Sequence, residues 1–260
     1  MDDRARKTAL ITGASSGIGR AFAEEYARRG LDLVLVARRA APLQDVAEML
    51  RKRNGIAAHV FPADLADPAT PDHLFDHLSA QNLEVDVLVN NAGFGVPGNL
   101  IDVDWSRHKD TIEVMAAAPV HLCHVFAPRM LSRGSGRVIN VSSLSAYLPP
   151  HAGGTLYYPV KSYLLQFSLA LRAELKGQGV HVTALCPGFT HTGFQAAAGG
   201  TVESVAVPKW LWSASSDVAR AAMGAVEKNK PVCIPGAFNK TVAAFFKITP
   251  APLGRFFVGG

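Results

Sequence analysis

Short apolar runs alternate with longer helical patterns along almost the whole chain, and this alternation constrains the fold more than any other feature. Val, Ile and Leu concentrate at residues 8–12, 31–37, 57–61, 85–90, 137–142, 180–185 and 232–234. Helical patterns lie between them at residues 17–29, 42–53, 71–80, 104–131, 157–176 and 216–228. Several runs are apolar on both faces, as is typical of parallel strands covered by helices on both faces of the sheet. The pattern therefore predicts an α/β fold with a doubly wound, mostly parallel sheet of about seven strands.

Domain organisation follows from the same pattern. The 260 residues leave the choice between one and two domains open, because large α/β sheets of roughly 250 residues often form one domain. No repeat, linker or shift in composition divides the chain, so we predict a single domain over residues 1–260. Two segments break the rhythm: a long connection at 193–215, which we expect to be a substrate loop, and an apolar C-terminal tail at 238–260.

Composition excludes several classes of protein. Apolar residues make up 48% and charged residues 18% of the chain, whereas a typical charged share is about 25%. Such a chain can bury a large core, which excludes a disordered protein. The net charge of +5 is compatible with nucleic acid, a membrane surface or an anionic small molecule. Because no basic stripe is interleaved with aromatic residues, we expect no nucleic-acid partner.

The cysteines and the first residues of the chain indicate the cellular compartment in which we expect the protein. Cys123, Cys186 and Cys233 lie far apart and form no pair with metal-ligand spacing, so we expect neither a disulfide framework nor a metal site. A reducing compartment, the cytoplasm, fits best. The first residues lack the apolar core of a secretory signal, and no apolar run reaches the roughly 18 residues of a membrane span. Core packing, a subunit contact and a membrane surface remain alternatives for the tail.

A glycine-rich turn follows the first predicted strand. Residues 12–19 read TGASSGIG and lead directly into a helical pattern. Glycines at a tight turn let backbone N–H groups approach a pyrophosphate, and the helix N-terminus adds a partial positive charge. This position after a strand and before a helix is the one that dinucleotide binding requires. The predicted contacts are Gly13, Ser15, Ser16, Gly17, Ile18 and Gly19.

The end of the second predicted strand bears on the choice of cofactor. An acidic residue there would bind the adenosine ribose hydroxyls and repel a 2′-phosphate. Instead the strand ends in Val36-Ala37-Arg38-Arg39, and two guanidinium groups can bind a phosphate. This favours NADP(H) over NAD(H).

Tyr157 and Lys161 lie four residues apart, so on a helix they share one face. Tyrosine has an ordinary pKa near 10, and a neighbouring ammonium lowers it by stabilising the phenolate. Pro159 places Tyr157 in the first turn of a helix, where proline is tolerated and the helix dipole also favours the phenolate. We therefore predict a general acid/base built from Tyr157 and Lys161.

Six ordered motifs make the pattern specific. The motifs are TGASSGIG at 12–19, Asp64-Leu65, NNAG at 90–93, NVSS at 140–143, YYPVK at 157–161 and Pro187-Gly188. With them, the chain resembles the short-chain dehydrogenase/reductase family over nearly its whole length. The resemblance implies a Rossmann-type fold and hydride transfer between a nicotinamide and a carbonyl or secondary alcohol. It also implies a homodimer or homotetramer.

The resemblance also implies roles for individual residues. Tyr157 would exchange a proton with the substrate oxygen, Lys161 would lower its pKa and bind the nicotinamide ribose, and Ser143 would hydrogen-bond the substrate oxygen. Ser145 is a weaker candidate for the serine role. The remaining implied cofactor contacts are Asp64, Leu65, Asn91, Ala92, Gly93, Pro187, Gly188, Thr190 and Thr192.

One position departs from the family pattern. The family carries an asparagine in the helix after the fourth strand, where it holds a water that links the lysine to solvent. Counting from Asn91 puts this position at Met115, whose sulfur is only a weak acceptor and has no donor. Three alternatives stay open: another group holds the water, turnover is slow, or the protein binds NADP(H) as a regulatory or scaffolding protein with little catalysis. Apolar residues in the predicted loop and tail, Trp210-Leu211-Trp212 among them, favour a hydrophobic substrate, although core packing explains them nearly as well.

Overall fold

A single parallel sheet organises the chain in the computed structural model, which describes residues 6–149, 153–192 and 208–248. Its seven strands have the order β3-β2-β1-β4-β5-β6-β7, and every pair of neighbours is parallel. The strands are β1 (Thr8–Thr12), β2 (Asp32–Ala37), β3 (Ala58–Pro62), β4 (Val87–Asn90), β5 (Gly136–Val141), β6 (Val180–Leu185) and β7 (Val232–Cys233). The predicted doubly wound Rossmann-type sheet is confirmed.

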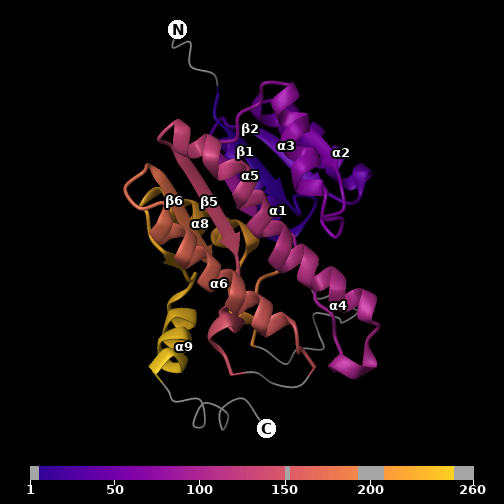
Figure 1. The fold of residues 1–260 in the computed structure, drawn as a ribbon. Helices are drawn as coiled ribbons and strands as arrows, with labels where there is room; N and C mark the ends of the chain where they lie inside the picture. Colours follow the sequence, from indigo (N-terminus) through magenta and orange to yellow (C-terminus); the bar gives the residue numbers. More distant parts are fainter. Residues whose placement is uncertain (1–5, 150–152, 193–207, 249–260) are drawn as a thin grey trace.

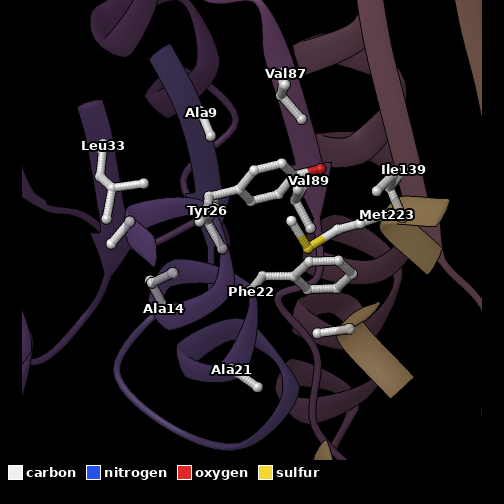
Figure 2. Close-up of a cluster of buried hydrophobic side chains, with 14 of the residues drawn as sticks. Ala9, Ala14, Ala21, Phe22, Tyr26, Leu33, Val87, Val89, Ile139 and Met223 are labelled. Atoms are coloured by element: carbon white, nitrogen blue, oxygen red, sulfur yellow. The ribbon is translucent and has the colours of Figure 1, made fainter. Parts of the chain in front are cut away.

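Helices cover both faces of the sheet (Figure 1). One core joins the strands to α1 (Gly17–Arg28), α2 (Ala40–Asn54) and α8 (Ser215–Glu227). Figure 2 shows its centre, where Phe22 and Tyr26 of α1 and Met223 of α8 lie against strand side chains. A second core on the opposite face contains side chains of α3 (Thr70–Ala80), α5 (Ala118–Ser132) and α6 (Tyr157–Glu174). These elements begin and end within two residues of the predicted ranges, except the predicted helix at 104–131.

The predicted helix at 104–131 is interrupted. Regular α-helix runs over α4 (Trp105–Ile112) and α5, and a π-helical turn, η2 (Glu113–Ala117), joins them. Pro119 explains this turn, because it has no N–H to donate to the carbonyl of Met115 and its ring crowds that carbonyl. The amide of Ala118 donates to Glu113 instead of Val114. Two carbonyls, those of Val114 and Met115, thus lose their regular α-helical donors.

The whole segment Trp105–Ser132 is long and apolar enough to cross a membrane by length and composition alone. Half of its most apolar window is buried inside the protein, however, as in the core helix of a soluble protein, which passes the same test. In Figure 1 α5 lies across the sheet, and it packs against α3 and β5. We therefore describe it as a core helix.

Short helices surround the carboxyl ends of the strands. Three 3₁₀ turns are η1 (Leu100–Asp102), η3 (Leu144–Tyr147) and η5 (Lys209–Leu211). The predicted apolar tail begins with a helix, α9 (Ala237–Ile248), that the sequence analysis did not predict. Of the predicted substrate loop at 193–215, residues 193–207 lie outside the described residues, as do residues 249–260 of the tail.

Candidate active site

A cleft of about 530 Å³ opens at the carboxyl ends of the strands, where ligands bind in open α/β sheets. It collects segments that follow six strands, from Gly13 after β1 to Pro187 after β6. The predicted site residues that line it are Gly13, Ser15, Ser16, Gly17, Ile18, Arg38, Arg39, Asp64, Leu65, Asn91, Ala92, Gly93, Ser143, Tyr157, Lys161, Pro187, Gly188, Thr190 and Thr192. One predicted contact, Gly19, does not line it.

Gly19 lies behind the turn rather than at its surface. A Cβ atom on Gly19 would stand 2.2 Å from the carbonyl oxygen of Gly13 and 2.5 Å from Nδ2 of Asn91. Gly19 therefore leaves room for the turn to fold back on itself, and its contact with the cofactor stays a prediction. Gly13 and Gly17 do face the cleft, and both have positive φ values, 65° and 56°, which glycine adopts without strain.

Hydrogen bonds from Asn91 fix the turn against the end of β4. Its Nδ2 donates to the carbonyl of Thr12 at 2.9 Å, and its backbone amide donates to the Thr12 hydroxyl at 2.9 Å. The same hydroxyl accepts from the amide of Ala92 at 3.0 Å and donates to the carbonyl of Val89 at 3.3 Å. Asn91 therefore holds the glycine-rich turn in place and also lines the cleft.

The N-terminus of α1 fits the pyrophosphate of a dinucleotide. Ser15, Ser16 and Gly17 line the cleft there. The N-cap residue, Ser16, makes no side-chain cap hydrogen bond, and the first turn of this helix holds no acidic residue. Its N–H groups and the positive end of its dipole are therefore available to an anion in the cleft.

At the end of β2 the cleft is bordered by cations. Arg38 and Arg39 line it, and Nη1 of Arg38 lies 4.0 Å from a carboxylate oxygen of Asp64. Both side chains of this pair are about half exposed, at 63% and 49%, so the ion pair contributes little to stability. A phosphate at this end of the cleft would meet two guanidinium groups and one carboxylate.

Tyr157 is the first residue of α6, as predicted, and Pro159 lies in the first turn of that helix. The side chains of Tyr157 and Ser143 are hydrogen-bonded to each other. Ser143 is held in turn, because its Oγ accepts from the amide of Ser145 at 3.1 Å. The two hydroxyls that the sequence assigns to the substrate oxygen thus lie together in one wall of the cleft.

Lys161 lies one turn further along α6 and is buried, with 4% of its surface exposed. Its Nζ donates to the carbonyl of Val141 at 2.9 Å and lies 5.8 Å from the centre of the Tyr157 ring. The hydroxyl of Ser142 donates to the carbonyl of Lys161 at 2.6 Å and fixes the helix to the end of β5. Burial lowers the pKa of Lys161 to about 8.

The expected lowering of the Tyr157 pKa does not appear in this structure. Burial raises the pKa of Tyr157 above its ordinary value, and the hydrogen bond from Ser143 opposes this only in part. Desolvation by burial is the largest cause of the raised pKa, and the ammonium of Lys161 donates to the carbonyl of Val141. Desolvation of the phenolate therefore outweighs the cationic neighbour.

Met115 lies in the π-helical turn beside this lysine and is 1% exposed. A Cβ atom on Gly93 would lie 3.1 Å from its sulfur and 3.7 Å from Nζ of Lys161. The structure thus places the one residue that departs from the family pattern next to the proposed catalytic groups. Gly93 leaves the room that both side chains occupy.

The sequence analysis missed the apolar wall of the cleft. Its members share uncharged, mostly apolar side chains that line the same cleft as Tyr157, and they are Phe94, Val114, Leu144, Leu148, Tyr158 and Phe189. Three of them directly follow a predicted motif and Tyr158 lies within one, but apolar residues at such positions carry no distinctive signal. No group of three or more metal-ligating side chains occurs among the described residues.

Comparison with known proteins agrees with this geometry. The family model described as short chain dehydrogenase matches residues 7–202. The chain is 34% identical over 236 residues to the probable oxidoreductase EphD of Mycobacterium tuberculosis, an alignment that covers 85% of this chain and 40% of EphD. The chain thus spans less than half the length of that relative.

Solved structures are similar over nearly the whole chain. A short-chain dehydrogenase from Sphingobium yanoikuyae in complex with NADPH has a TM-score of 0.82 and 30% identity, covering 94% of this chain and 96% of that one. A short chain dehydrogenase/reductase from Burkholderia phymatum in complex with NAD has a TM-score of 0.79 and 28% identity, covering 93% of each chain. Structural relatives therefore bind either nicotinamide cofactor. The chain belongs to the short chain dehydrogenase family.

Proposed function

We propose that this protein transfers a hydride between NADP(H) and the carbonyl or secondary alcohol of an apolar substrate. The observation that carries the proposal is the single cleft, which joins a dinucleotide-binding turn to the Ser143, Tyr157 and Lys161 side chains. When bound, the cofactor supplies or accepts the hydride. The chain's own residues bind, orient and exchange a proton.

Tyr157 donates its phenolic proton to the substrate oxygen in the reductive direction and takes it back in the oxidative one. Ser143, already hydrogen-bonded to Tyr157, positions that oxygen and offers a second hydrogen bond. The ammonium of Lys161 stabilises negative charge as it develops on the Tyr157 oxygen, because two charges interact strongly in a buried site. A pKa of about 8 keeps most of Lys161 protonated at neutral pH.

The preference for NADP(H) rests on Arg38 and Arg39 at the cofactor end of the cleft. No acidic residue ends β2 to repel a 2′-phosphate, and Asp64 already has Arg38 as an ion-pair partner.

The proposed class of substrate follows from the few charged side chains in the cleft. Among the described residues that line the cleft, the charged ones are Arg38, Arg39, Asp64 and Lys161. Of these described lining residues only Lys161 offers a charge beside Tyr157 to an anionic or zwitterionic substrate, whereas a bulky ketone would contact the apolar wall.

The test combines binding and turnover. NADPH fluorescence should change on mixing with the protein, and NADPH should then be consumed with bulky apolar ketones faster than with small charged aldehydes. Tyr157→Phe removes the proton donor and should lower turnover by at least about 100-fold while NADPH still binds. Equal turnover of this variant and the wild type would contradict the role of Tyr157.

A second candidate is an NADP(H)-binding regulatory or scaffolding protein with little catalysis, which the position of Met115 favours. In that case NADPH binds and no member of the ketone panel consumes it. For the first candidate we expect Met115→Asn to preserve or raise turnover. A large loss with unchanged NADPH binding would show that this position does not serve proton exchange.

Two further features of the sequence remain proposals. We propose a homodimer or homotetramer that forms through α5 and α6, supported by the half-exposed Tyr163 that stacks on Phe167 along α6. Mass measurement in solution tests it. Location in the cytoplasm stays a prediction from the cysteines, which are free and buried at positions 123, 186 and 233.

A further inference from the structure

A small cavity lies beside the cleft, and Phe94 and Tyr157 line both spaces. The volume of the cavity is about 10 Å³, which is about the space that one water molecule requires. Its other walls include His108 and Thr111 of α4 and Thr155, which lies just before α6. The cavity is therefore a direct neighbour of the proposed proton donor.

His108 is buried, with 5% of its surface exposed, and one of its two ring nitrogens lacks a partner among the described residues. The other nitrogen, Nε2, lies 3.0 Å from the carbonyl oxygen of Leu100. Because a carbonyl only accepts hydrogen bonds, Nε2 carries the proton, and Nδ1 of the neutral ring is an acceptor. A buried acceptor without a donor costs free energy, so we expect a donor at Nδ1.

The cavity suits a water molecule as this donor. Besides Tyr157, its polar side chains are those of His108, Thr111 and Thr155, and a buried water makes about three hydrogen bonds. The hydroxyl of Thr111 donates to the carbonyl of Arg107 at 2.9 Å and keeps lone pairs that can accept. A metal ion fits less well, because the described residues that line the cavity include no acidic side chain and no cysteine.

The cavity lies where three segments of the chain meet. Gly98, which lines it, pairs with Gly154 in an isolated parallel bridge, so the segments before η1 and before α6 are joined there. The bond from Nε2 of His108 to Leu100 joins α4 to η1. A water at Nδ1 would add a polar link from α4 to the segment that leads into α6.

We propose that the cavity binds one water molecule, which donates a hydrogen bond to Nδ1 of His108, and that His108 is a positioning residue for Tyr157. The amide of Tyr157 donates to the carbonyl of Gly154 at 3.1 Å, so a link to this segment also restrains the start of α6. The positioning role rests on the proposed function, whereas the water site does not.

Crystal structures of the full chain without cofactor test the water site independently of the reaction. We expect electron density for one water within about 3 Å of Nδ1 of His108 in the wild type. The same water should remain in His108→Asn, which keeps a side-chain acceptor near the place of Nδ1, and should be lost in His108→Gln. Absence of this water in the wild type, or a side chain that donates to Nδ1 in its place, would overturn the water site.

The same two variants test the positioning role, because they separate the two ring nitrogens. His108→Gln keeps a donor near the place of Nε2 and loses the acceptor, whereas His108→Asn loses the donor to Leu100. We expect His108→Gln to lower kcat with a ketone at least about fivefold, because small displacements of a reacting group slow the reaction, and to leave the Kd for NADPH unchanged. His108→Asn should keep kcat within about twofold of the wild type, although its melting temperature should be the lower of the two.

A merely structural role predicts the opposite order, in which kcat falls with the melting temperature. A larger loss of kcat in His108→Asn, or a wild-type kcat in His108→Gln, would overturn the positioning role. His73→Gln alters an exposed histidine of α3 and should change neither quantity. If the water is present but the wild type consumes NADPH with no ketone, the proposed function and the positioning role fail together, and the water site stands.

Discussion

The two halves of the cleft recognise their ligands by different means. In the cofactor half, the turn from Gly13 to Gly19 and the helix N-terminus present backbone atoms, and the Asn91–Thr12 hydrogen bonds fix them. In the substrate half, the wall consists of side chains such as Phe94, Leu148 and Phe189. Backbone recognition depends on a few glycines that cannot vary, whereas a wall of apolar side chains can change shape residue by residue.

The largest expected effect is in the cofactor half. Gly19→Ala brings a methyl group to within 2.2 Å of the Gly13 oxygen and should distort the turn. Strain of about 1–3 kcal/mol predicts a Kd for NADPH that is raised up to roughly 100-fold, as measured by fluorescence titration.

The matched control is Gly224→Ala in α8, where a Cβ would meet nothing within 4 Å. It should leave NADPH binding unchanged and stabilise the protein by about 1 kcal/mol, because alanine favours helix over glycine. Equal NADPH binding in the wild type and Gly19→Ala would show that the turn tolerates a side chain.

The next effect separates the two cofactors. Arg38→Ala combined with Arg39→Ala should raise the KM for NADPH roughly 30-fold through lost charge-assisted hydrogen bonds. The KM for NADH should change less than about threefold, because NADH has no 2′-phosphate with which the two arginines could interact. Arg53→Ala, an exposed arginine of α2 outside the cleft, is the control. An equal loss with both cofactors would assign the pair a structural role.

A smaller effect is expected in the substrate half. Phe189→Ser removes an aromatic ring from the apolar wall and should lower kcat/KM for a bulky ketone about tenfold. The Kd for NADPH should stay the same, because the cofactor half does not depend on this side chain. A parallel loss of NADPH affinity would show that the two halves are not separable.

The smallest expected effect is a pH dependence of the protein's stability that is due to Lys161. Burial lowers its pKa to about 8, against an ordinary value of 10.5. Between these values the unfolded chain binds more protons than the folded one, so stability rises with pH. Below pH 8 both states are protonated and the dependence vanishes.

Lys161→Met should remove this dependence. From pH 8 to 9.5 the free energy of unfolding of the wild type should rise by about 1–2 kcal/mol relative to this variant. Lys176→Met, which alters an exposed lysine, should leave the pH dependence as in the wild type. Parallel curves for the wild type and Lys161→Met would show that the ammonium is solvated in the folded state.

Prediction of the fold from the sequence succeeded where a residue pattern is compatible with only one local structure. The short runs that are apolar on both faces predicted the parallel strands, and the glycines between β1 and α1 predicted the turn. It failed for α9, because an apolar segment without strong start and stop signals is compatible with loop, helix or subunit contact. It also failed for the pKa of Tyr157, since the burial that raises this pKa depends on packing in the whole fold and not on the spacing of Tyr157 and Lys161.

The π-helical turn changes what Met115 means. Replacing asparagine by methionine removes a side-chain acceptor, but Pro119 releases the main-chain carbonyls of Val114 and Met115 from their regular helical donors. A carbonyl is present whatever the side chain at its position. A comparison of aligned side chains finds no hydrogen-bond acceptor like that of asparagine at residue 115. The carbonyl acceptors of this turn depend instead on Pro119, four residues later. Chemistry at such a position can therefore persist when its signature residue is gone.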